Sequence, residues 1–253
     1  MGVEISEDHP RYRSLVTRER MAELASKGIV ATTGLIAHGR GEAFDYLLGE
    51  GTTSEGELAE KVAAAHLLEA ANPVISINGN TAALCPEEVI SLSRSIPAAL
   101  EVNLFHRTDQ RVEKVCGHME SMGAREVLGR EPDARLEGIA SERSLCTTEG
   151  IFSADVILVP LEDGDRAEAL VTAGKGVIAI DLNPLSRTSL TASISIVDEV
   201  TRALPNIERF VVDLRDDPKE RRRLIDNYDN MENLRAVARK MCHHLVEGLQ
   251  GKA

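Results

Sequence analysis

The sequence contains no tryptophan, and only three tyrosines and four phenylalanines stand among its 253 residues. Its core must therefore be built from aliphatic side chains, which suits helices packed on a sheet better than an aromatic-rich β-sandwich. The four cysteines are far apart and form no CxxC pair. Because this spacing indicates neither a disulfide framework nor a zinc ribbon, we predict buried free thiols and no metal site built from protein side chains.

Positive charge is also scarce, since 29 Lys and Arg residues face 41 Asp and Glu residues, for a formal net charge of −12. This balance disfavours a protein that holds nucleic acid by neutralising phosphates, although focused arginine sites can still bind small phosphorylated ligands. The amino terminus has no apolar signal core, and no later run reaches the roughly 18 apolar residues of a membrane span. We therefore predict a cytoplasmic protein that binds neither membranes nor nucleic acid.

The beginning of the chain is predicted to be mostly helical. The spacing of apolar residues predicts an arginine-rich amphipathic helix over 10–26. A glycine-rich joint follows over 28–52. A second helix is predicted over 54–71, because Ser54 and Glu57 fit a capping box.

From Pro73 onward, short apolar runs alternate with helical segments. The predicted strands lie in the runs 73–79, 99–105, 125–129, 154–161, 176–182 and 193–198. The predicted crossover helices are 86–95, 109–123 and 165–174. This alternation favours an α/β, Rossmann-like fold, with a mostly parallel sheet and helices on both faces.

The end of the chain is helical and highly charged, with a last helix predicted over about 230–249. We predict one overall domain in three parts. These are a mainly helical segment over 1–72 that packs on the core, a Rossmann-like core over 73–215, and a helical extension over 216–253.

Polar clusters follow four of the apolar runs. They are Asn78–Asn80, Glu101 with Asn103, Glu162–Arg166 and Asp181–Pro184. Any one of them alone is more typical of a capped turn. An open parallel sheet, however, places its ligand site at the carboxyl ends of its strands, so four such clusters together predict a ligand crevice.

Standard nucleotide fingerprints are absent. Gly174-Lys175-Gly176 lacks the rest of a P-loop, and no GxGxxG follows the first predicted strand. What remains for phosphate is the segment His38–Glu42, which we predict to open a helix, with outward N–H groups and Arg40 as a positive fork. Ser186–Thr188 offers further hydroxyl and guanidinium donors, although such a run is more often an ordinary helix cap.

Several longer segments together resemble a known family. They are HPRYRSLVTRER, GLIAHGRGEAFDYLLGE, NPVISINGNTAAL, EVNLFHRT, ADVILVPLEDGDRAEALV and VIAIDLNPLSRTS. In order and spacing, over roughly residues 8 to 210, they resemble the archaeal phosphopantothenate synthetase family, also called 4-phosphopantoate:β-alanine ligase. The resemblance implies a Rossmann-like homodimer that converts ATP, 4-phosphopantoate and β-alanine into AMP, diphosphate and 4′-phosphopantothenate on the route to coenzyme A.

The resemblance also implies the ATP contacts. Carried over onto this sequence, they are Arg18, Arg40, Asp181, Leu182, Asn183, Arg187, Thr188, Glu199 and Val200. The last two depart from the family, which often has Asn-Ile there, so their contacts are best made by backbone atoms. Mg²⁺ is expected to bridge the phosphate oxygens, and the arginines, Arg40 in particular, to stabilise the reacting phosphates.

Substrate contacts are inferred from placement. Asn78, Asn80 and Asn103 are predicted to contact the hydroxyl and carboxylate groups of phosphopantoate, and Arg107 or Arg166 its phosphate. Three carboxylates are candidates for Mg²⁺ or for deprotonating the β-alanine ammonium, namely Glu101, Asp163 and Asp165. Structural roles compete, because Glu101 could pair with a buried arginine and the 162–166 carboxylates could cap a helix.

Three other functions fit parts of this sequence less well. A nucleotide-dependent oxidoreductase would need the dinucleotide fingerprint that is missing here. A non-enzymatic nucleotide-sensing dimeric module fits the fold but leaves the dense polar set unexplained. A pantothenate synthetase acting on unphosphorylated pantoate would carry a HIGH-like signature, and the additional arginines favour a phosphorylated acid.

Overall fold

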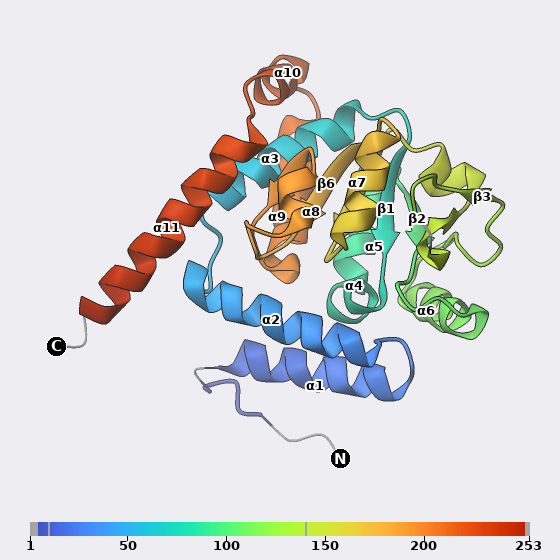
Figure 1. The fold of residues 1–253 in the computed structure, drawn as a ribbon, viewed down its shortest axis with the longest axis horizontal. Helices are drawn as coiled ribbons and strands as arrows, with labels where there is room; N and C mark the ends of the chain where they lie inside the picture. Colours follow the sequence, from blue (N-terminus) through green and yellow to red (C-terminus); the bar gives the residue numbers. More distant parts are fainter. Residues whose placement is uncertain (1–4, 10, 140, 251–253) are drawn as a thin grey trace.

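The fold is a five-stranded parallel sheet surrounded by helices, seen in a computed structural model that describes residues 5–9, 11–139 and 141–250 (Figure 1). The sheet strands are β1 (Pro73–Ile77), β2 (Ala99–Val102), β5 (Val156–Pro160), β6 (Gly176–Ile180) and β7 (Ile194–Ile196). Their order across the sheet is β2-β1-β5-β6-β7, and every pair is parallel. The predicted α/β class is confirmed.

This strand order reverses direction between β1 and β5. From β1 the chain first moves outward to β2, and it later returns to β5 and continues through β6 to β7. Such a switch point leaves the carboxyl ends of two neighbouring strands uncovered by crossover helices. The edge beyond β1 and β5 is therefore the expected place for a ligand.

Helices account for most of the remaining chain. They are α1 (Tyr12–Ser26), α2 (Thr32–Leu48), α3 (Ser54–Glu69), α4 (Gly79–Leu84), α5 (Pro86–Ser95), α6 (Asp109–Ser121), α7 (Gly164–Thr172), α8 (Arg187–Thr191), α9 (Val200–Leu214), α10 (Pro218–Asp226) and α11 (Asn230–Gln250). A small antiparallel pair, β3 (Ala134–Arg135) and β4 (Leu145–Cys146), lies in the excursion between α6 and β5, together with the short helical turns Glu142–Ser144 and Thr148–Phe152. In Figure 1, α1 and α2 lie across one end of the sheet, and α11 projects from the body.

Alternate strand residues enter two separate hydrophobic cores. Ile75 and Leu158 join the larger core, which also holds apolar side chains of α3, α5 and α9. Val74 and Ile157 join a smaller core with Leu170 of α7 and residues of the β3–β4 excursion. Because successive side chains of a strand point to opposite faces, the aliphatic runs of the sequence fill both faces of the sheet at once.

Three local predictions are wrong. The glycine-rich joint over 28–52 is mostly helix α2, so His38–Glu42 lies inside a helix and does not open one. Its backbone N–H groups are therefore used within the helix and cannot cradle a phosphate. The run 125–129 forms no strand, because only Leu128 exchanges hydrogen bonds with β2 before Gly129 turns away at φ +108°.

The third correction concerns the start of α3. The helix begins at Ser54 as expected, but its cap is Thr53, whose hydroxyl accepts a hydrogen bond from the Gly56 N–H at 3.0 Å. The helix predicted over 10–26 is α1, and residue 10 lies outside the described residues.

Three of the four cysteines are buried, as predicted from their spacing. Cys85, Cys116 and Cys146 are buried free thiols as predicted, whereas Cys242 is exposed. None of the described helices combines the length and the apolar character that crossing a membrane requires.

Candidate active site

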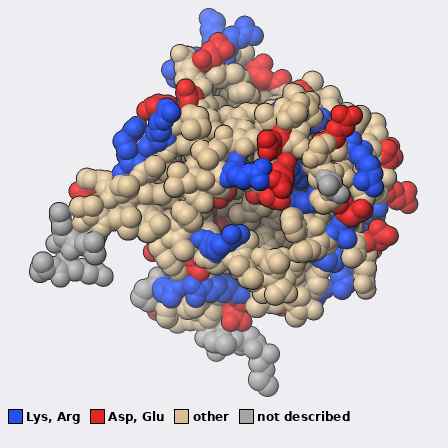
Figure 2. Space-filling view, in the orientation of Figure 1, with Lys and Arg blue, Asp and Glu red and all other residues tan. Residues whose placement is uncertain are grey.

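A cleft of about 710 Å³ lies at the carboxyl edge of the sheet. Its floor is formed by the residues that follow β2, β1, β5 and β6, and α2 forms the opposite wall. Figure 2 shows a hollow in this face of the molecule, bordered by both positive and negative side chains. The cleft therefore lies where the strand order predicts it.

Two asparagines follow β1 at the centre of the cleft, and both also hold the backbone together. The Asn78 amide donates to the carbonyls of Pro160 (2.8 Å) and Leu161 (3.2 Å), and its oxygen accepts from the Asn80 N–H at 2.9 Å. Asn80 in turn donates to the Gly34 carbonyl of α2 at 2.9 Å. These bonds fix the two walls of the cleft relative to each other.

Glu162, which follows β5, is buried between two arginines. Its carboxylate accepts hydrogen bonds from Arg143 and from Arg166, and Arg166 also donates to Ser76 at 3.2 Å. Burial opposes ionisation of Glu162, but the two guanidinium groups outweigh it and hold its pKa below the ordinary value. Asp163 lies 3.7 Å from Arg143, and its more exposed side chain caps no backbone N–H group at the start of α7.

The segment after β6 contributes a rigid polar turn. The Asp181 carboxylate accepts from the Asn183 N–H at 3.0 Å and from the Ser186 hydroxyl at 2.5 Å. Burial raises the pKa of Asp181, while these hydrogen bonds and the charge of Arg40 oppose the increase. Thr188 donates to the Glu162 carbonyl at 2.9 Å, which ties the β6 end to the β5 end.

Arginines enter the cleft from several directions. Arg40 projects from α2 and has no ion pair among the described residues. Arg187 lies at the rim with its side chain 65% exposed, and it pairs with Asp165 at 2.5 Å and with Glu168 at 2.9 Å. The cleft thus combines the exposed guanidinium groups of Arg40 and Arg187 with the buried one of Arg143, an arrangement suited to anionic ligands.

Comparisons with known proteins agree with this geometry. The model of the family described as "Phosphopantothenate/pantothenate synthetase" matches residues 55–244. Three relatives, each named 4-phosphopantoate–β-alanine ligase, come from Methanospirillum hungatei JF-1 (57% identity, 84% of this chain and 87% of the relative), Methanosarcina mazei (53%, 96% and 96%) and Thermococcus onnurineus (47%, 98% and 96%).

The chain belongs to the phosphopantothenate/pantothenate synthetase family. The resemblance drawn from the sequence segments is thereby confirmed. The cleft is lined by about half of the residues that the sequence predicted for the site. These are Arg40, Asn78, Asn80, Asp163, Asp181, Leu182, Asn183, Arg187 and Thr188.

Arg18 and Asp165 lie near the cleft without lining it. Arg18 of α1 pairs with Glu42 of α2 at 2.7 Å. Burial opposes ionisation of Glu42, but hydrogen bonds from Ser14 and Arg18 prevail and lower its pKa to about 2. Asp165 is an exposed partner of Arg187 at the rim.

Glu101 and Asn103 are buried on the side of the β3–β4 excursion. Glu101 stands inside β2, and its carboxylate accepts from the N–H groups of Thr147 (2.8 Å) and Ile151 (2.6 Å). Burial raises its pKa. Asn103 donates to the carbonyls of Arg143 (3.2 Å) and Leu145 (3.0 Å). Both side chains therefore hold in place the segment that carries Arg143.

The remaining expected residues lie elsewhere. Arg107 donates to the Gly129 carbonyl at 2.8 Å and does not line the cleft, and Arg166 is 1% exposed beneath Glu162. Glu199 caps α9 by accepting from the Thr201 N–H at 2.8 Å, and burial raises its pKa. Val200 is buried as the first residue of that helix.

The structure adds two arginines that the sequence reasoning missed. Arg111 comes from the first turn of α6, and Arg143 from the β3–β4 excursion. Neither follows a strand, so the rule that selected the other residues could not find them. Burial lowers the pKa of both guanidinium groups. A usable signal for Arg111 was its position three residues after the segment EVNLFHRT.

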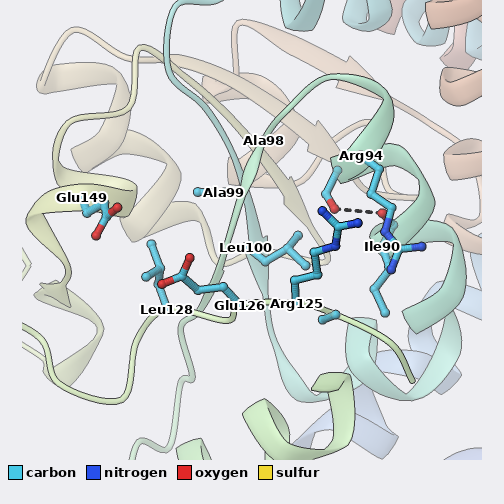
Figure 3. A pocket seen from close by; sticks show the side chains of 11 residues that line it. Ile90, Arg94, Ala98, Ala99, Leu100, Arg125, Glu126, Leu128 and Glu149 are labelled. Carbon is cyan, nitrogen blue, oxygen red and sulfur yellow. Dashed lines mark hydrogen bonds between the residues drawn. The ribbon is translucent and has the colours of Figure 1, made fainter. Parts of the chain in front are cut away.

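A second cavity lies at the opposite edge of the sheet, at the start of β2. Its volume is about 220 Å³, and Figure 3 shows Arg94 and Arg125 on one side of it and Glu149 on the other. The Arg94 guanidinium donates a hydrogen bond to the Gly123 carbonyl at 2.7 Å. None of the predicted site residues lies there, so the larger cleft is the candidate active site.

Proposed function

We propose that this chain is an ATP-dependent amide ligase of coenzyme A biosynthesis, a 4-phosphopantoate–β-alanine ligase. It joins 4-phosphopantoate to β-alanine and releases 4′-phosphopantothenate, AMP and diphosphate. The observation that carries the proposal is the convergence of four arginines from different elements, Arg40, Arg111, Arg143 and Arg187, on one cleft at the switch point of the sheet. A reaction between two phosphorylated substrates needs this density of positive charge. The relatives that cover most of the chain carry the same activity in their names.

ATP fits the side of the cleft formed by α2 and by the end of β6. Arg40 and Arg187 can neutralise its phosphates, and the polar turn Asp181–Asn183 offers donors and acceptors in fixed positions. Arg18 of α1, and Glu199 with Val200 at the start of α9, remain proposed ATP contacts. They would require the nucleotide to extend beyond the cleft as it is shaped here.

The residues of the cleft also fit Mg²⁺. Among the described residues no cluster of three or more acidic, histidine or cysteine side chains forms a metal site. Nucleotide-bound Mg²⁺, however, takes most of its ligands from phosphates and water, with one or two carboxylates from the protein. Asp163 is the carboxylate in the cleft that is best placed to supply one, because it caps no helix N–H group. The ion would neutralise the phosphate charge.

The chemistry requires two displacements. In the first, a carboxylate oxygen of phosphopantoate attacks the α-phosphorus of ATP, and the bond to diphosphate breaks. In the second, the β-alanine ammonium first loses one proton, its nitrogen then attacks the activated carbonyl carbon, and AMP leaves as the nitrogen loses a second proton to become the amide. Whichever of Asp163 and Asp165 does not hold Mg²⁺ is the proposed acceptor of the first proton, and Glu101 is the third candidate. Positioning three reactants in one cleft supplies much of the acceleration, an effect worth up to about 7–11 kcal/mol in favourable cases.

Two further properties belong to the same proposal. We place the reaction in the cytoplasm, where ATP is made and used, and we infer a homodimer from the family resemblance. Light scattering of the purified protein tests the second point directly. The nucleotide-sensing module is not favoured, and it would bind ATP without forming product.

The test is AMP and diphosphate release by the purified protein with ATP, Mg²⁺ and β-alanine, together with mass detection of the amide. Either 4-phosphopantoate or pantoate is the acid. We expect product with the phosphorylated acid and little with pantoate. Nucleotide binding without product from either acid would contradict the ligase proposal and favour the nucleotide-sensing module.

Arg40→Ala is the first variant to compare. Because Arg40 has no ion pair among the described residues, its removal leaves no buried partner and should not affect folding. Loss of one charged donor to the phosphates should lower kcat/KM by about 100-fold. Arg235→Ala is the control, since Arg235 is an exposed arginine of α11 whose ion pair among the described residues is with Glu232.

A further inference from the structure

Arg111 is a cationic group of the cleft that the structure leaves without an acidic partner. Its guanidinium donates to the His106 carbonyl at 2.6 Å and to the Ile29 carbonyl at 3.1 Å. Neither acceptor carries a full charge, and no carboxylate lies within ion-pair distance of Arg111 in the described chain. The side chain is therefore fixed in direction while its positive charge remains available to a ligand.

The second cationic group is the buried guanidinium of Arg143, which lines the same cleft. Arg143 is 4% exposed and Arg166 is 1% exposed, and both share the buried carboxylate of Glu162. The other carboxylate paired with Arg143 in the described chain, that of Asp163, lies at the longer distance of 3.7 Å and is 41% exposed, so it neutralises Arg143 only weakly. Nε of Arg143 is also buried without a hydrogen-bond partner. An anionic ligand would bring a closer negative charge to Arg143 than Asp163 does.

Both arginines contact the loop that contains Phe105 and His106. Arg111 holds the His106 carbonyl, and the Arg143 guanidinium lies 5.5 Å from the centre of the Phe105 ring. Arg143 belongs to the β5 side of the cleft through Glu162, whereas Arg111 belongs to the β2 side. The Arg111 guanidinium lies beside Gly79, directly after β1, where it also reaches the Ile29 carbonyl, so the two groups enter the cleft at different strand ends.

Two cationic groups at different places in one cleft suit an acid with an anion at each end. In 4-phosphopantoate, the phosphate and the carboxylate stand at opposite ends of a short carbon chain, and a hydroxyl lies between them. The carboxylate must reach the ATP side, which begins at the β5 and β6 ends of the sheet. Arg143 is next to that side, and Arg111 is at the far end of the cleft.

We propose that the acid lies across the end of β1, with its phosphate on Arg111 and its carboxylate on Arg143. Arg111 is then the residue that distinguishes 4-phosphopantoate from pantoate, in place of Arg107 or Arg166. Arg143 orients the carboxylate of either acid, and the buried Glu162–Arg166 pair positions Arg143. This assignment rests on the proposed ligase function and adds the direction in which the acid is bound.

The experiment measures binding of 4-phosphopantoate and of pantoate separately by calorimetry, and turnover with each acid. Arg111→Gln should weaken binding of 4-phosphopantoate by on the order of 10- to 100-fold and change pantoate binding little, because it removes one charged hydrogen-bonding partner of the phosphate. Arg143→Gln should weaken both acids to a similar degree and lower kcat. Arg130→Gln is the matched control, since Arg130 contacts Glu113 and Glu120 of the same helix outside the cleft.

Arg111→Lys keeps the proposal testable if the Gln variant folds poorly. It retains the charge but not the guanidinium fork, so it should keep a reduced preference for the phosphorylated acid. Circular dichroism of each variant identifies any loss of folding.

Each remaining outcome has a distinct meaning. Equal losses for both acids in Arg111→Gln, or loss of discrimination in Arg107→Gln instead, would overturn the assignment while the wild type still forms the amide. A wild type that binds both acids equally and forms no amide would overturn the proposed function itself.

Discussion

Glu60 shows at the scale of one residue how burial and pH are linked in this protein. Its side chain on α3 is fully buried, and neither carboxyl oxygen has a hydrogen-bond partner among the described residues. Burial first, and the negative charge of Asp198 second, raise the pKa of Glu60 to about 9. Folded Glu60 therefore keeps a proton at neutral pH that the unfolded chain, with an ordinary carboxyl pKa near 4.5, releases.

We predict from this that stability falls as pH rises. Between the two pKa values the folded state holds one more proton than the unfolded state, so Glu60 lowers the free energy of unfolding by up to about 1.4 kcal/mol per pH unit. Glu60→Gln should remove this slope. Urea denaturation at about pH 6 and about pH 8 measures it. Glu57→Gln, an exposed change one helical turn away, should keep it. Equal slopes in all three proteins would contradict the prediction.

At the scale of one element, α2 contains glycines in two different environments. A Cβ added at Gly39 would meet no atom within 4 Å, whereas one added at Gly34 would lie 2.3 Å from Oδ1 of Asn80. Gly34 is therefore required where α2 approaches α4. Gly39 is only a flexible point in a helix that would tolerate alanine.

Two alanine substitutions test this difference. Gly39→Ala should raise the free energy of unfolding by about 0.5–1 kcal/mol, because alanine favours a helix interior more than glycine does. Gly34→Ala should lower it by about 1–3 kcal/mol, because Asn80 must move and its bond to the Gly34 carbonyl is lost. Thermal unfolding followed by circular dichroism gives both values. Destabilisation by Gly39→Ala would instead indicate the phosphate-binding turn first predicted over 38–42.

The elements also show what sequence patterns can predict. Five of the six apolar runs are strands of the sheet, because buried parallel strands need continuous aliphatic residues. Asn78 and Asp181 reached the cleft because each directly follows such a strand. The glycines of α2 concealed a helix, since its stability comes from contacts with distant residues such as Leu182 and Val237.

The residues that sequence reasoning misplaced have a common cause. Glu101 was assigned to a strand end, but it lies inside β2, which stops at Val102, and its side chain points from the sheet toward Thr147 and Ile151, away from the cleft. Arg143 was missed because the return of the β3–β4 excursion to the cleft depends on long-range contacts, including the hydrogen bond from Asn103. Local periodicity carries no information about such contacts.

At the scale of the whole molecule, the carboxyl-terminal helix is connected to the cleft by a third hydrophobic cluster. Leu234 and Val237 of α11 pack there with Leu48 of α2 and with Leu182. Leu182 also lines the cleft on its proposed ATP side. The helical extension thus supports two cleft walls at once, although it contributes no residue to the cleft lining.

The connection predicts that a core change in α11 reaches ATP binding. Leu234→Ala should lower the free energy of unfolding by about 2–5 kcal/mol, because Leu234 is 3% exposed and its truncation leaves a cavity. The cavity lets Leu182 and α2 shift, so ATP affinity should fall as well, which calorimetry at a temperature where the variant is folded would measure. Leu245→Ala is the control on the same helix, since Leu245 is 47% exposed and should change stability by no more than about 0.5 kcal/mol. Unchanged ATP affinity in a destabilised Leu234→Ala variant would mean that α2 and the strand ends fix the cleft without help from α11.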